Sequence, residues 1–206
     1  DKHGIDHVTL QPEVIGEDHE HASHEIHIEN QASNVFHDGE TFYVDCSSGD
    51  EKHRMAYHVW GNPSNPVLMC VHGLTRRGSD FKTMALAMCK DYYVVCPDVV
   101  GRGDSDRLSN PMQYAVPQYV ADIAQLVKTL GVSQVDWFGT SMGGLIGMVY
   151  AAMPKSPIRK MLINDVGPKI EPEAIKRLGS YVGQPFAFAN RAEALTRLNQ
   201  ICASRS

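Results

Sequence analysis

The chain has 206 residues, enough for one well-buried domain or most of a larger one. Apolar residues make up 43% and charged residues 21%, as in ordinary globular proteins, which argues against intrinsic disorder of the whole chain. The net charge of −5 disfavours nucleic acid as the main partner, because phosphate binding needs a basic surface. No apolar run approaches the roughly 20 residues of a membrane-spanning helix, so no membrane is expected as a partner.

The first 38 residues form a polar extension rich in histidine and acidic residues. Within it, HEHASHEIHIE carries His19, His21, His24 and His27. Imidazoles at such close spacing can share a divalent metal, but this spacing matches no ligand frame. We therefore expect a solvated extension and no metal site. Its start also lacks the charged-then-apolar pattern of a signal peptide.

Cysteine usage indicates a reducing compartment. The five cysteines are Cys46, Cys70, Cys89, Cys96 and Cys202. Their number is odd and their spacing fits no metal template, so free thiols and a cytoplasmic location are expected. Cys70 and Cys96 lie in apolar runs and are predicted to be buried as small hydrophobes.

From residue 40 the chain becomes strongly patterned. TFYVDC and KHRMAYHVWG alternate apolar and polar residues, and SSGDE between them supplies the residues of a tight reversal, which predicts a β-hairpin. The continuous apolar run at 66–73 predicts a strand buried on both faces. Helical spacing follows at 79–90, and a second buried strand is predicted at 91–98.

The alternation of strands and helices continues to residue 165. Residues 116–131 place apolar side chains three and four apart and end in glycine, which predicts a helix. A strand at 134–139, a Gly-rich helix at 142–153 and a strand at 157–165 come next. This order predicts the α/β class, with a mostly parallel sheet flanked by helices. After residue 165 only helices are predicted, the last at 190–203.

Residues 139–144 read GTSMGG and follow a predicted strand directly. A serine between glycines that leads into a helix is typical of the sharp turn that exposes a nucleophile. The carboxyl ends of parallel strands meet at one edge of a sheet, where reactive crevices form. Two other predicted strands end there in HGLTRRGSDF and PDVVGRGDSD, and the fourth ends in INDVGP.

These four segments, in this order, resemble the α/β-hydrolase superfamily over about residues 40–200, and within it bacterial esterase-like hydrolases with a helical lid. The resemblance implies that Ser141 is the nucleophile, and that Gly139 and Gly143 leave room for the strained turn. It also implies that the backbone N–H groups of Leu74 and Met142 form an oxyanion hole.

The acid and the base of the triad are harder to assign. In the resembling family the histidine before the glycine, here His72 before Gly73, shapes the oxyanion loop and is not the base. The triad order in this fold is serine, then an acid, then histidine. Asp165 ends a predicted strand and is a candidate acid; the alternative is a structural residue of the NDVGP turn, with the acid further along.

None of the ten histidines follows Ser141, and the last is His72. Two explanations are open. In the first, the C-terminal part of the domain is missing: residues 39–168 are the N-terminal part of the hydrolase core, 169–206 begin the lid, and these 206 residues alone are inactive. In the second, the chain is a non-catalytic ligand-binding protein. The first is favoured because the last strand would otherwise keep a bare edge.

The expected function is a serine hydrolase that cleaves a carboxylic ester or related acyl bond of a small-molecule substrate, without metal or organic cofactor. A serine nucleophile argues against haloalkane dehalogenases and epoxide hydrolases, which use aspartate there. Carbon–carbon bond hydrolases and cofactor-free haloperoxidases keep the serine and stay as alternatives. The sequence does not specify the substrate or the oligomeric state.

Overall fold

The computed structural model describes residues 35–169, 172–179, 182 and 187–202. The predicted extension at 1–38 therefore lies almost wholly outside the described residues, with all four of its clustered histidines. The described residues belong to two compact units: residues 35–169 to the larger, and residues 172–179, 182 and 187–202 to the smaller.

The larger unit begins with the predicted hairpin, which is confirmed. β1 (Phe36–Ser48) and β2 (Glu51–Gly61) pair antiparallel along almost their whole length. The turn lies at Gly49 and Asp50, and Gly49 adopts the left-handed φ of 58° that favours glycine. β1 starts earlier than the alternating pattern predicts, because Phe36 and Glu40 pair with Gly61 and Val59 at the end of β2, on either side of an irregularity in the register.

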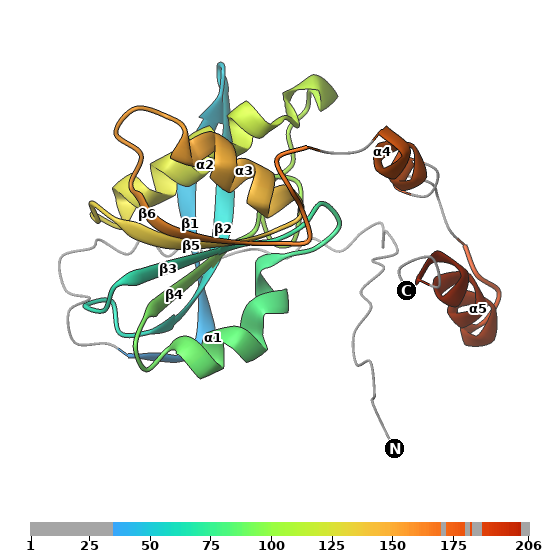
Figure 1. The fold of residues 1–206 in the computed structure, drawn as a ribbon, viewed down its shortest axis with the longest axis horizontal. Coiled ribbons are helices and arrows are strands. Elements are labelled where there is room, and N and C mark those ends of the chain that lie inside the picture. Colours follow the sequence, from blue (N-terminus) through green and yellow to red (C-terminus); the bar gives the residue numbers. More distant parts are fainter. Residues whose placement is uncertain (1–34, 170–171, 180–181, 183–186, 203–206) are drawn as a thin grey trace. The chain divides into compact units, whose positions relative to one another are not determined.

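The hairpin continues into a six-stranded sheet in the order β1-β2-β4-β3-β5-β6 (Figure 1). The four strands that follow the hairpin in the chain are β3 (Val67–Val71), β4 (Tyr93–Pro97), β5 (Val135–Thr140) and β6 (Ile158–Asn164). These four run parallel, and β2 joins them antiparallel to β4. The mostly parallel α/β architecture is thus confirmed, and its carboxyl-terminal edge carries the loops after β3, β4 and β5.

Helices cover both faces of this sheet (Figure 1). On one face lie the 3₁₀ turn η2 (Gly78–Phe81) and α1 (Lys82–Met88); on the other lie α2 (Val116–Thr129) and α3 (Met142–Ala151). A short 3₁₀ turn, η3 (Pro111–Gln113), precedes α2. The predicted helices at 79–90, 116–131 and 142–153 are confirmed, with slightly different ends.

Successive side chains of a strand point to opposite faces of the sheet, so an apolar core forms on each face. In β4, Tyr93 and Val95 pack into the core under α2 and α3, whereas Val94 and Cys96 pack into the smaller core under α1. Such two-sided burial is what a continuous apolar run predicts. Cys70 and Cys96 are completely buried, as expected from their sequence context.

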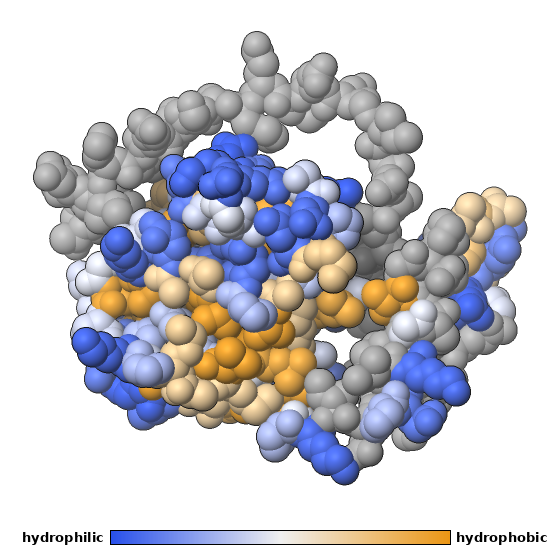
Figure 2. Space-filling model, turned by 90° about the horizontal axis from the view of Figure 1, so that it is seen from above, coloured by the Kyte–Doolittle hydropathy of each residue, from blue (hydrophilic) through white to orange (hydrophobic). Residues whose placement is uncertain are grey.

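The outer strand β6 is much less covered than its neighbours. Among the described strands it pairs with β5 alone, and its Met161 and Leu162 are 37% and 57% exposed. Val149 and Met153, at the end of α3, are also exposed. Figure 2, which looks onto the molecule from the side of α3, shows apolar side chains gathered on the surface.

The second unit contributes α4 (Pro172–Gly179) and α5 (Arg191–Cys202), which confirms the two helices predicted after residue 165. Of the helices described here, none has the length and apolar character required to cross a membrane.

Candidate active site

Ser141 occupies a strained turn between β5 and α3. Its φ of 52° and ψ of −115° lie in a region that residues other than glycine rarely adopt. The backbone around it is braced: its N–H donates to the Asn164 carbonyl at 2.8 Å, and its carbonyl accepts from the N–H groups of Gly144 and Leu145. The backbone therefore places the side chain of Ser141, whose hydroxyl has no hydrogen bond to another described residue.

The turn is possible only because glycine lies on either side of it. A Cβ atom on Gly143 would lie 2.0 Å from the Val71 carbonyl oxygen, and one on Gly139 would lie 2.5 Å from the Gly143 carbonyl oxygen. Both neighbours are backbone atoms, which cannot rotate away. The close approach of α3 to β3 and β5 therefore depends on these two glycines, in the way the sequence motif implies.

The loop after β3 lies beside this turn. A Cβ atom on Gly73 would lie 3.5 Å from the Cβ of Ser141, so the His72-Gly73-Leu74 segment borders the serine side chain. Leu74 is 38% exposed, while Met142 is buried at the start of α3. The structure therefore brings together the residues proposed for nucleophile and oxyanion hole, and the role of the two N–H groups stays a prediction.

Arg102, which sequence reasoning did not single out, links the two sides of this site. Its Nε donates to the Leu74 carbonyl at 3.2 Å, and its Nη2 lies 4.0 Å from the Met142 sulfur. The guanidinium is fixed in turn by hydrogen bonds to the Val100 carbonyl and the Tyr119 hydroxyl, and it lies over the Tyr119 ring. An arginine so restrained holds the loop after β3 next to the start of α3.

His72 has both ring nitrogens engaged with the backbone. Nδ1 donates to the Gly73 carbonyl at 2.7 Å, and Nε2 accepts from the Val99 N–H at 3.0 Å. Burial lowers the pKa of His72 to about 4, so the ring is neutral at physiological pH. With no free lone pair, it braces the loop and has no nitrogen available to take the proton of Ser141.

We expect this buried imidazole to make the protein less stable in mild acid. The unfolded chain binds a proton at His72 near pH 6.5, whereas the folded chain does so only near pH 4, so stability is lost as pH falls through this window. The loss is on the order of 3 kcal/mol at the lower end. Denaturant unfolding of the wild type and of His72→Gln at several pH values between 7 and 4 measures it.

The His72→Gln variant serves as the reference for the pH dependence of stability, because groups other than His72 also titrate between pH 7 and 4. The stability of His72→Gln should fall less steeply with acidification than that of the wild type. Parallel pH profiles for the two proteins would contradict the assignment of a neutral, buried His72.

Asp98, at the end of β4, holds neighbouring loops in place through its carboxylate, and no sequence pattern indicated this role. It is fully buried and accepts hydrogen bonds from the N–H groups of Gly78 and Asp104, at 2.5 and 2.8 Å. His58 Nε2 lies 3.2 Å from the same carboxylate, and His58 Nδ1 contacts the Thr41 hydroxyl at 2.8 Å. Burial opposes the charge, but these donors outweigh it and hold the pKa of Asp98 below its ordinary value.

Asp165 follows the residue that braces the serine turn, Asn164, and has a left-handed φ of 60°. Its side chain is exposed. The buried histidines of the described chain have other neighbours: Asp122 for His53, Asp98 for His58, and the backbone for His72. The role of Asp165 as the triad acid therefore stays a prediction.

The same architecture occurs in known proteins. A family model described as the alpha/beta hydrolase fold matches residues 66–201. The 3-hydroxybutyrate-oligomer hydrolase of Cupriavidus necator is 58% identical over 163 residues, which cover 79% of this chain and 56% of that protein. The chain thus spans about half the length of this curated relative.

Solved structures agree with the family match. An alpha/beta hydrolase from Novosphingobium aromaticivorans superposes with a TM-score of 0.71 at 36% identity, over 79% of this chain and 56% of that one. The thioesterase domain from the curacin biosynthetic pathway gives a TM-score of 0.61 at 25% identity, over 81% of this chain and 64% of that one.

Proposed function

Because this chain belongs to the alpha/beta hydrolase fold family, we propose that it carries the nucleophile of a serine hydrolase that cleaves carboxylic esters. The observation that carries the proposal is the backbone of Ser141, strained at φ 52° and braced against Asn164 beside the Gly73 loop. A strained turn of this kind persists only where surrounding structure holds it, and such turns concentrate at reactive sites.

In the proposed reaction, the Ser141 oxygen attacks the acyl carbon of the ester while a general base takes the hydroxyl proton. The carbonyl oxygen becomes negatively charged and is stabilised by the N–H groups of Leu74 and Met142. The ester C–O bond then breaks, the alcohol leaves with a proton, and water hydrolyses the acyl-serine to release the acid.

The base is proposed to be a histidine, and no histidine follows Ser141 up to Ser206. His72 is committed to backbone hydrogen bonds. We therefore expect these 206 residues by themselves to acylate slowly, since an unactivated serine hydroxyl is a weak nucleophile. Asp165 would orient that histidine if it acts as the acid.

For the substrate, we propose short oligoesters of a hydroxy acid. The support is the 58% identity to a protein named as a 3-hydroxybutyrate-oligomer hydrolase. In such an oligomer each linkage joins the hydroxyl of one unit to the carboxyl of the next, so every linkage is an acyl ester of the kind that the serine mechanism cleaves.

A substrate panel tests the proposal on protein expressed from the complete reading frame. We expect hydrolysis of linear 3-hydroxybutyrate dimers and trimers and of p-nitrophenyl acetate, with an initial burst where deacylation is slow. Cleavage of a ring-opened diketone but of no ester would instead indicate a carbon–carbon bond hydrolase. Failure to react with a fluorophosphonate, together with no turnover of any substrate, would indicate a non-catalytic binding protein.

A further inference from the structure

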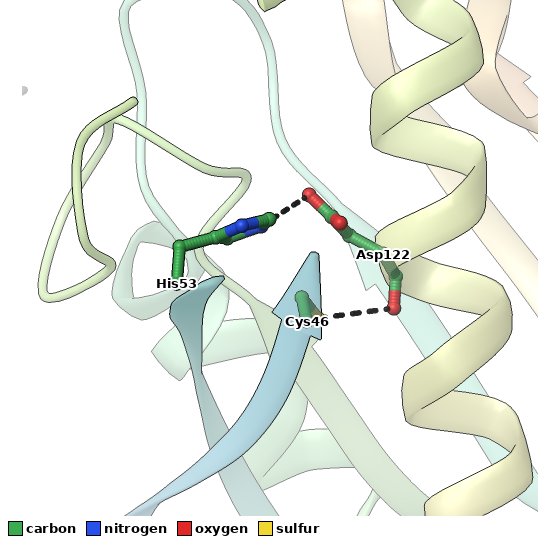
Figure 3. A group of neighbouring side chains, drawn as sticks. All are labelled: Cys46, His53 and Asp122. Atoms are coloured by element: carbon green, nitrogen blue, oxygen red, sulfur yellow. Dashed lines mark hydrogen bonds and ion pairs between the residues drawn. The ribbon is translucent and has the colours of Figure 1, made fainter. Parts of the chain in front are cut away.

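A buried group of three potential ligands lies where the hairpin meets α2, and none of the three belongs to the serine turn (Figure 3). Cys46 on β1 and His53 on β2 are direct partners in the antiparallel ladder, so their side chains point to the same face. That face is covered by α2, which presents Asp122 to both. The hairpin register and the helix together create a cluster of sulfur, nitrogen and oxygen donors.

The donor atoms are close enough to share one ion. His53 Nε2 lies 3.1 Å from Asp122 Oδ2, and the three donor atoms all lie within 4.8 Å of one another. The side chain of His53 has no exposed surface, and Cys46 and Asp122 are also buried. In tetrahedral zinc sites with metal–ligand distances of 2.0–2.3 Å, donor atoms lie about 3.3–3.7 Å apart.

Several buried polar atoms of this cluster have no hydrogen-bond partner among the described residues. Within this part of the chain, both ring nitrogens of His53 and the Oδ2 of Asp122 lack a hydrogen-bond partner, although Nε2 and Oδ2 are only 3.1 Å apart. The thiol of Cys46 donates to the backbone carbonyl of Asp122 at 3.9 Å. Buried polar atoms without partners are rare and costly. By contrast, both nitrogens of His58 have polar partners at hydrogen-bond distance.

We propose that Cys46, His53 and Asp122 bind a zinc ion that fastens the β1–β2 hairpin to α2. Thiolate, imidazole and carboxylate are the ligands zinc takes in proteins. The carboxylate is already oriented by Gln118, whose Nε2 donates to Asp122 Oδ1 at 2.7 Å and to the Ser47 carbonyl at 3.0 Å. Outer partners of this kind fix ligand geometry in established zinc sites.

A cavity of about 710 Å³ lies beside the cluster. Cys46, His53 and Asp122 are among the residues that line it, together with Gln125. Besides Asp122, its lining carries two basic residues, Lys52 and Arg54, and two acidic ones, Asp45 and Asp106. An entry path beside a preformed donor set is one of the features that a genuine metal site requires.

The same three residue types could in principle form a cysteine nucleophile with a histidine base. Reactive cysteines are partly exposed and have a lowered thiol pKa. Cys46 is only 5% exposed, and its thiol faces the backbone carbonyl of Asp122, so it lacks the access that a nucleophile needs. A buried cysteine beside a histidine and a carboxylate fits a structural metal site instead.

Cobalt is the probe for this site, because a thiolate–Co²⁺ bond gives a charge-transfer absorption that histidine-only sites lack. The titration uses metal-free full-length protein in which His3, His7, His19, His21, His24, His27 and His37 are replaced by alanine, so that histidines of the first 38 residues contribute nothing. We expect one equivalent of Co²⁺ to bind with a thiolate band and to be displaced by Zn²⁺. Zinc at about 100 times its Kd should raise Tm by about 5–10 °C.

Matched cysteine variants locate the thiolate. Cys46→Ser should lose the band, and Cys89→Ser, which removes a half-buried thiol elsewhere, should retain it. Absence of a thiolate band in the parent protein would overturn the proposal whether or not the Cys46 variant folds. A band that survives Cys46→Ser would overturn it equally.

Discussion

Replacing Ser141 by alanine is expected to lower kcat for ester hydrolysis by at least about 10⁴-fold while leaving the fold intact. The turn is held by the backbone atoms of Ser141, through the Asn164 carbonyl and the N–H groups of Gly144 and Leu145, and alanine keeps all of them. The substitution removes only the attacking oxygen. Rates are measured on p-nitrophenyl acetate and on a 3-hydroxybutyrate trimer, with both proteins expressed from the complete reading frame, and thermal unfolding is measured on the same samples.

Ser133→Ala is the matched control, because Ser133 is an exposed serine just before β5. It should leave both the rate and the fluorophosphonate labelling unchanged. Undiminished turnover in Ser141→Ala, with an unchanged melting temperature, would remove Ser141 from the role of nucleophile and with it the proposed acyl-serine mechanism.

The second large effect is expected for Gly143→Ala, which should destabilise the protein by about 3 kcal/mol or more. The new methyl group would lie 2.0 Å from the Val71 carbonyl oxygen and 3.0 Å from that of His72. Neither oxygen can yield by rotating a side chain, so α3 must move away from β3. This movement also displaces Ser141, and activity should fall further than the lost stability alone explains.

Gly179→Ala is the control, since a Cβ atom at Gly179 meets nothing within 4 Å and its φ is not left-handed. Its effect should stay within about 0.5 kcal/mol. Urea unfolding curves of both variants give the comparison. Equal midpoints for Gly143→Ala and the wild type would show that α3 is not packed against β3 as closely as described.

The order of elements in the larger unit is predictable from sequence because its signals are local. The continuous apolar runs at 66–73 and 91–98 specify strands buried on both faces, and β3 and β4 lie within them. The three-and-four spacing of residues 116–131 specifies α2, whose apolar side is buried as expected. Glycine at the serine turn predicts a backbone approach that Gly143 makes.

Contacts that depend on register and tertiary packing could not be predicted. Cys46 and His53 become neighbours only through the pairing of β1 with β2, and Asp122 reaches them from a helix far along the chain. Cysteine spacing alone therefore gave no reason to expect a metal ligand among them. Arg102 is similar: its position in a loop carries no sign that it contacts both Leu74 and Met142.

The brace between β6 and the serine turn runs through the carbonyl of Asn164, not through its amide side chain. Any amino acid presents that same carbonyl, and the side chain at this position is exposed. Position 164 is thus open to randomisation in a directed-evolution library aimed at substrate range. New side chains can be introduced there, one residue from the candidate acid, while the carbonyl that holds the serine turn is kept.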